Sequence, residues 1–242
     1  MHRHFDGEIA ELRQRIVAMG GLAEAMIHKA LRSLLERREA YWDDIALMEE
    51  EVNELQIEID DRAIHLTALQ QPVGTDVRFL FMASRVASDL ERVADQAVNI
   101  CQNARILLEE PPLKPLIDLP ILGGLAERMV HEGLDSLVRR DVALAQRVLE
   151  EERRVDALKD QVFRELLTYM MSDTSTISRA LALILISRNL ERVGDHATNI
   201  AEETIYLVEG RDVRHRHEEK LRLGRGGEPT RIGGNAETAS SP

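Results

Sequence analysis

The stretch LERVADQAVNI at Leu90–Ile100 returns as LERVGDHATNI at Leu190–Ile200, with eight of eleven positions identical at an offset of 100 residues. Such self-similarity indicates a chain built from two copies of one unit. Each copy carries a glutamate and an aspartate four residues apart, and these carboxylates are Glu91, Asp95, Glu191 and Asp195. On a helix this spacing puts both on one side, where like charges repel. A repulsive pair present in both copies indicates a chemical role, and a bound cation is the leading candidate.

The duplication extends upstream of these segments. GGLAEAMIH at Gly20–His28 matches GGLAERMVH at Gly123–His131 in seven of nine positions, at an offset of 103. Val52 and Val155 correspond at the same offset, so the second repeat loses three residues between its second and third segments. We place this loss in a loop, because three residues removed from a helix would rotate its face by most of a turn.

Apolar residues recur at helical spacing in three segments of each repeat. They predict helices over residues 6–38, 42–69, 76–108, 122–140, 142–171 and 174–209. Either Asp43 or Asp44 can cap the second helix, and Gly210 closes the last one. The predicted fold is all-α, with two tandem antiparallel three-helix bundles related by a pseudo-twofold axis.

A cluster of prolines separates the repeats, and its members are Pro111, Pro112, Pro115 and Pro120. We therefore assign residues 1–110 to the first repeat, 111–120 to a proline-rich connector and 121–210 to the second repeat. Residues 211–242 are rich in glycine and charge with almost no apolar periodicity, so we expect a disordered tail there.

Composition limits the possible functions. The net charge of −12 argues against nucleic-acid binding and favours cations or basic partners. The only cysteine, Cys101, has Ala201 as its counterpart, so we expect it to pack in the core of a protein from a reducing compartment. The N-terminus lacks a secretory signal, and no apolar run is long enough for a membrane span. We expect a cytoplasmic protein that meets a membrane only through partners.

A helical wheel places the carboxylates of the first motif at the border of its apolar face. That face consists of Leu90, Val93, Ala94, Ala97 and Ile100. Glu91, Asp95 and Asn99 lie beside it, where oxygen ligands, charge and water suit a hard or intermediate cation. The plainer interpretation is that these carboxylates pair with arginines such as Arg92 or Arg188. The duplication favours the metal site.

Weaker candidate ligands lie nearby. Asn99 and Asn199 follow the motif in pattern, and Glu152 and Asp156 on the predicted fifth helix could face it across the bundle. The corresponding positions of the first repeat are Glu49 and Asn53, so the charge is not matched.

A second duplicated pattern pairs glutamate with histidine four residues later, and the residues are Glu24, His28, Glu127 and His131. These side chains could add metal ligands, but we interpret them first as ordinary partners within each helix. A di-iron carboxylate enzyme would instead place histidine three residues after glutamate. The sequence also lacks a nucleophile elbow, a phosphate-binding loop and zinc-ligand spacing. We expect no catalytic residues.

Several blocks together resemble the PhoU family of phosphate-uptake regulators. They are the two LER-V motifs, AMGG in the first helix, QQPVGTDVR before the third and LLTYMMSD before the sixth. The resemblance spans residues 5–217 and implies two three-helix bundles and a cytoplasmic, often dimeric regulator. It also implies multinuclear metal clusters, often of iron, on Glu91 and Asp95 and on Glu191 and Asp195.

The resemblance further implies a non-enzymatic adaptor between the ATPase of the phosphate ABC transporter and the phosphate-sensing histidine kinase. Such a regulator represses the phosphate-starvation response when phosphate is plentiful. The family's Asp-Leu-Arg pattern appears as Asp76-Val77-Arg78 in the first repeat but as Thr176-Ile177-Ser178 in the second. The alternatives are a metal-storage or di-iron protein, an accessory protein of a low-affinity phosphate transporter, and a helical scaffold without metal.

Overall fold

The structure is a computed structural model that describes residues 2–213. The described part of the chain contains six α-helices and one short 3-10 turn, and no strand. The elements are α1 (His2–Glu36), α2 (Trp42–Gln70), α3 (Thr75–Leu108), α4 (Asp118–Arg139), α5 (Val142–Ser172), η1 (Thr174–Thr176) and α6 (Ile177–Glu209). The all-α prediction is confirmed. From residue 214 onward, the predicted disordered tail lies outside the described residues.

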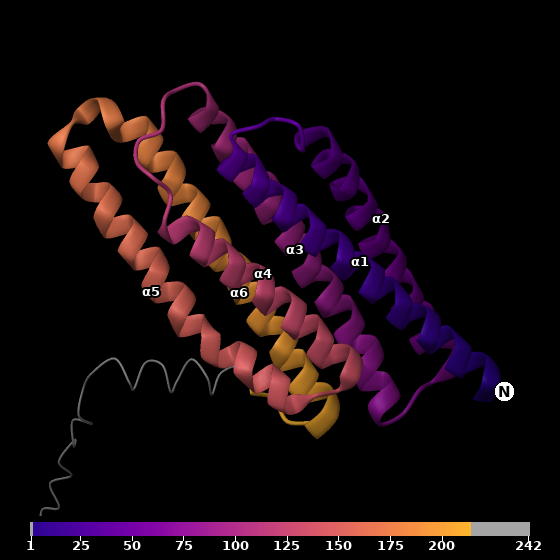
Figure 1. The fold of residues 1–242 in the computed structure, drawn as a ribbon. Helices are drawn as coiled ribbons and strands as arrows, with labels where there is room; N and C mark the ends of the chain where they lie inside the picture. The colour runs from indigo at the N-terminus through magenta and orange to yellow at the C-terminus, as the bar shows by residue number, and fades with distance from the viewer. Residues whose placement is uncertain (1, 214–242) are drawn as a thin grey trace, which may run out of the picture.

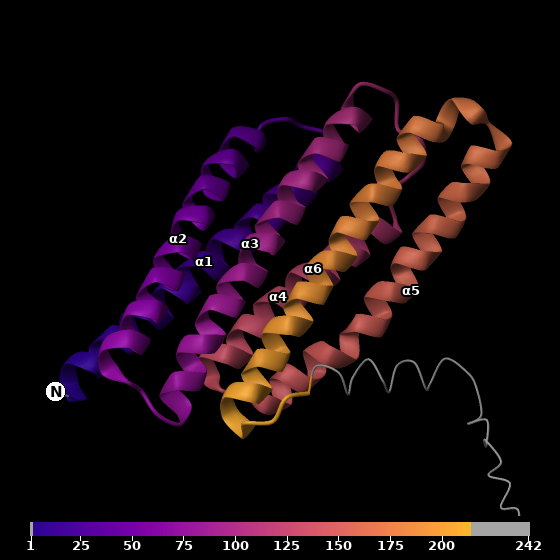
Figure 2. The ribbon, with the colours of Figure 1, turned by 180° about the vertical axis from the view of Figure 1, so that it is seen from behind.

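The helices form two layers that run along one common axis. Figure 1 shows α1 and α4 side by side in the nearer layer, and Figure 2 shows α2, α3, α6 and α5 on the opposite face. Helices α1–α3 form one three-helix unit and α4–α6 the other, and α3 packs directly on α6. One hydrophobic core runs through both units. None of the helices in residues 2–213 combines the length and apolar character of a membrane span.

The duplicated GGLAE segments form the contact between α1 and α4. A Cβ atom added to Gly20 would lie 2.5 Å from Leu134 Cδ1, and one added to Gly123 would lie 2.5 Å from Leu31 Cδ2. Each glycine therefore lets a leucine of the other repeat approach its backbone closely. We call this contact the α1–α4 seam.

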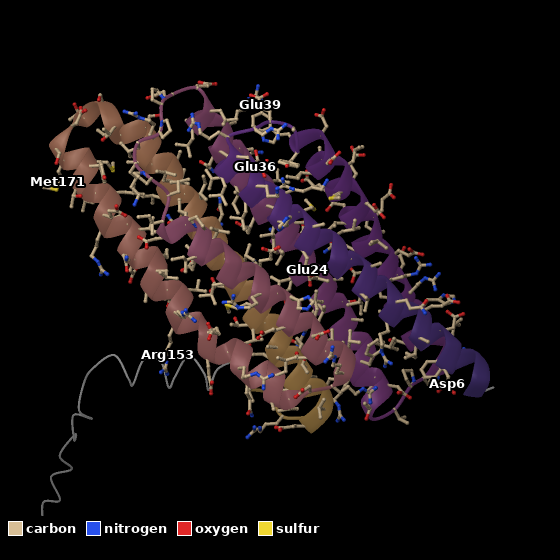
Figure 3. The ribbon with its side chains drawn as sticks, viewed as in Figure 1. Asp6, Glu24, Glu36, Glu39, Arg153 and Met171 are labelled. Atoms are coloured by element: carbon tan, nitrogen blue, oxygen red, sulfur yellow. The ribbon has the colours of Figure 1, made fainter. Side chains whose placement is uncertain are left out.

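The glutamates and histidines of the second duplicated pattern pair across the α1–α4 seam, and not within their own helices as their spacing predicts. His28 Nδ1 lies 3.0 Å from Glu127 Oε1, and His131 Nδ1 lies 3.3 Å from Glu24 Oε1. Figure 3 labels Glu24 where α1 runs beside α4. The intrahelical interpretation was wrong, because a glutamate and a histidine four residues apart on each of two antiparallel helices can also pair between the helices.

Helix ends agree with the predicted boundaries to within a few residues. Asp141 caps α5 by accepting a hydrogen bond from the Leu144 backbone N–H at 3.0 Å, and Gly210 ends α6 with φ of +67°. The predicted cap of α2 is wrong, because Tyr41 occupies that position and both aspartates lie in the first turn. There Asp44 instead pairs with Lys29 of α1.

Candidate metal centre

The carboxylate motifs lie on α3 and α6 as predicted. Leu90, Val93 and Ala97 of α3 are fully buried, and so are their counterparts Leu190, Val193 and Ala197 of α6. The Glu91 and Asp95 side chains keep 20% and 35% of their surface exposed, which places them at the border of the core. The first motif lies near Glu49 of α2, and the second lies near Glu152 and Asp156 of α5.

Three carboxylates gather between α2 and α3, and we call them cluster one: Glu49, Glu91 and Asp95. Burial raises the pKa of Glu91, and the charge of Asp95 acts in the same direction. Burial also raises the pKa of Glu49, and the charge of Asp95 again acts in the same direction. Arg92 lies 3.5 Å from Glu91 Oε2 and 3.7 Å from Asp95 Oδ2, so the predicted arginine pairing is present on this side.

Four carboxylates gather between α5 and α6, and we call them cluster two: Glu152, Asp156, Glu191 and Asp195. Burial raises the pKa of Asp195 to about 6, and the charges of Glu191, Glu152 and Asp156 contribute in that order. Part of the Asp195 side chain still reaches solvent, which screens these charges. Glu152 and Asp156 therefore face the α6 motif as the sequence suggested.

A lysine enters cluster two from α5. Lys159 Nζ lies 3.3 Å from Glu191 Oε1, 3.8 Å from Asp156 Oδ1 and 3.3 Å from Asp160 Oδ1. Burial lowers the pKa of this ammonium, but Glu191 and the two aspartates outweigh that effect, so its pKa lies above the ordinary value. The corresponding residue of α2 is Gln56, which carries no charge.

Two residues that the sequence did not single out lie between the clusters. His196 Nδ1 is 2.9 Å from Asp89 Oδ1, and Asn199 Nδ2 donates to the same oxygen at 2.9 Å. These bonds join α3 to α6. Asn199 therefore contacts the opposite repeat in this structure, whereas the Asn99 backbone carbonyl accepts a bond from Asn103. The sequence repeat does not preserve this contact, because the counterparts of Asp89 and His196 are Asn189 and Gln96.

The donor chemistry of both clusters suits a hard cation, since each consists of carboxylate oxygens. Burial, and after it the charge of neighbouring carboxylates, raises the pKa of Glu49, Glu91 and Asp195. In residues 2–213, no three histidine, cysteine or carboxylate side chains converge on one point that could hold an ion. Metal binding would thus require side-chain rotation, and in cluster two the displacement of Lys159. Cys101 is buried in the core, which confirms its packing role, and this burial raises the pKa of its thiol to about 12.

Comparison with known proteins supports the resemblance. The family model described as "PhoU domain" matches residues 16–104 and 119–204. A phosphate-specific transport system accessory protein PhoU homolog of Pseudomonas aeruginosa is 36% identical over 214 residues, which cover 88% of each chain. The accessory protein PhoU of Escherichia coli K12 is 31% identical over 211 residues, covering 87% of this chain and 88% of the other.

Solved structures give the same result. The crystal structure of PhoU from Pseudomonas aeruginosa superposes with a TM-score of 0.83 at 35% identity, covering 86% of this chain and all of that one. The phosphate transport system regulatory protein PhoU of Streptococcus pneumoniae gives 0.78 at 26% identity, covering 86% and 99%. Both matches extend over nearly the whole described bundle.

Proposed function

This chain belongs to the PhoU family, and we propose that it is a regulator of phosphate uptake that represses the phosphate-starvation response. In this role it acts in the cytoplasm as an adaptor between the ATPase of the phosphate ABC transporter and the phosphate-sensing histidine kinase. Support comes from its relatives, which are named accessory or regulatory proteins of phosphate transport. We propose no catalysis. The homodimer that the resemblance implies stays a prediction.

The observation that carries the metal part of this proposal is the pairing of two carboxylate clusters on one face. Each cluster lies between the third helix and the second helix of its repeat. We propose that cations, iron being the candidate, bind at Glu91 and Asp95 with Glu49, and at Glu191 and Asp195 with Glu152 and Asp156. When bound, they supply positive charge that relieves the repulsion within each cluster and fixes the two helices to each other.

Deletion of the gene tests the regulatory role. The expected result is that a phosphate-starvation reporter becomes active in phosphate-rich medium and is silenced again when the intact gene is restored. A reporter that stays silent in the deletion strain contradicts the proposed repression.

An oxygen-dependent turnover assay on iron-loaded protein separates the adaptor from a di-iron enzyme. The adaptor predicts no turnover beyond that of free iron. Turnover that depends on Glu91 and Glu191 would instead support an enzyme.

A further inference from the structure

Both repeats expose large apolar side chains at corresponding positions. The pairs are Ile64 and Leu167, Val77 and Ile177, and Phe81 and Leu181, which follow the offsets of 103 and 100 in the sequence. Their exposed fractions range from 38% for Val77 to 67% for Ile64. Single exposed apolar residues are common on soluble proteins, but three matched pairs are not explained by chance exposure.

One further matched pair, Leu35 and Val138, lies on α1 and α4 and so outside this group of helices. Several other exposed apolar residues lack any matching. Leu47 of α2 is 66% exposed, yet its counterpart in α5 is Glu150. Ile57 is 64% exposed, and its counterpart is Asp160. The fold therefore tolerates charge at equivalent surface positions, and the matched pairs have a reason other than stability.

The matched residues lie on the same face as the carboxylate clusters. Val77 precedes Asp95 by eighteen residues, which is five full helical turns, and Phe81 is offset from that line by about 40°. The same spacing relates Ile177 and Leu181 to Asp195 on α6. Helices α2, α3, α6 and α5 lie next to one another in this order (Figure 2), so the face that they make has acidic residues in its middle and apolar residues toward its two ends.

The two apolar groups lie at opposite ends of this face. Ile64, Val77 and Phe81 lie near the α2–α3 loop, whereas Leu167, Ile177 and Leu181 lie near the α5–α6 turn. Figure 3 labels Met171, which is 80% exposed, at the tip of the α5–α6 hairpin. We call these groups end one and end two.

Cross-helix bonds set the distance between the ends. The 2.9 Å contacts of Arg85 with Glu203 and of Asp89 with Asn199 fix how antiparallel α3 and α6 align. In that alignment Leu181 lies level with Leu107, and at 1.5 Å per residue Phe81 and Leu181 are roughly 40 Å apart.

We propose that this face binds two identical subunits of one partner at the same time, one at each end. Two equivalent apolar ends related by a pseudo-twofold axis fit a partner that has a true twofold axis, because each end then meets the same site on its own subunit. The partner presents an apolar pocket on each subunit and basic residues near its own axis, opposite the acidic middle of the face. This inference rests on the proposed function, in which the chain binds the transporter ATPase, and it requires that ATPase to present two identical subunits.

Titration of the full chain against the purified ATPase subunit, held as its dimer, tests the proposal. Wild type is expected to bind one chain per two subunits. Phe81→Glu and Leu181→Glu should each weaken binding about tenfold or more, and the double variant should weaken it further than either. Leu47→Glu is the control, since Glu150 already occupies its counterpart, and it should keep the wild-type affinity.

Each alternative has a distinct result. Binding by wild type that neither single variant weakens overturns the docking surface and leaves the adaptor role in place. Weakening by only one of the two variants overturns simultaneous binding at both ends. Failure of wild type to bind the ATPase contradicts the proposed function itself.

Two further measurements exclude other occupants of the face. Sedimentation of the chain alone shows whether Phe81→Glu dissociates a homodimer, which would make the face a contact between copies of this chain. Flotation with vesicles of anionic phospholipid shows whether the ends bind lipid. Either result overturns the proposal, and circular dichroism of each variant confirms that its helices are intact.

Discussion

The two repeats are alike at the α1–α4 seam, but they differ on the face made by α2, α3, α6 and α5, which we call the carboxylate face. At the seam each repeat contributes the same glycine, glutamate and histidine, and the glycine–leucine and histidine–glutamate contacts each occur twice. At the carboxylate face the motif is also duplicated, but its surroundings are not. Cluster one contains three carboxylates, whereas cluster two contains four carboxylates and Lys159.

The difference follows from what each region contacts. Residues at the seam contact the other repeat across the pseudo-twofold axis, as His28 contacts Glu127, so a change in one repeat disturbs a contact that the other repeat also makes. The ion pairs of Lys159 are all made within its own repeat, so Lys159 and Gln56 can differ freely. The two clusters should therefore have different affinities for a cation.

Alanine substitutions at the seam should give the largest effect. Gly20→Ala and Gly123→Ala each crowd a leucine of the other repeat, and overpacking of this kind costs about 1–3 kcal/mol. Gly21→Ala and Gly124→Ala are matched controls, because nothing lies within 4 Å of their added Cβ atoms. They should stabilise the helices by up to about 1 kcal/mol. Urea unfolding measures the difference, and equal stabilities of the two sets would contradict close packing at the seam.

Exchange of the charge beside the motifs should have the next largest effect. In an Asp95→Ala background, where cluster one is disabled, Lys159→Gln should strengthen Mn²⁺ binding at cluster two about tenfold, since a competing cation is removed. In an Asp195→Ala background, Gln56→Lys should weaken Mn²⁺ binding at cluster one by a similar factor. Calorimetric titration measures both. If neither substitution changes affinity, Lys159 does not distinguish the clusters.

The pH dependence of the metal-free protein should give the smallest effect. Because the pKa of Asp195 is raised to about 6, the folded chain holds its proton at a pH where the unfolded chain has released it. The stabilising contribution of this proton is full below about pH 4 and disappears as pH rises through 6. Asp195→Asn should therefore raise the melting temperature slightly at pH 7, by roughly 2 °C, and have no such effect near pH 4. A gain of equal size at both pH values would contradict the raised pKa.

Sequence patterns predicted what depends on spacing within one helix. Helical periodicity gave all six helices, and the wheel placed Leu90 in the core and Glu91 at its border. The pairing of Glu24 with His131 was not predictable, because the same spacing permits contacts within a helix or across two. Asp89, His196 and Lys159 were missed because the repeat does not preserve them, and only the packing of α3 on α6 and α5 on α6 reveals their partners.

The metal content of the chain purified from cells tests the central claim most directly. Elemental analysis should find bound metal in wild type and almost none in the Asp95→Ala, Asp195→Ala double variant, while circular dichroism shows the same helical content in both. Retention of the wild-type metal content by the folded double variant would contradict the claim that the duplicated carboxylates hold cations.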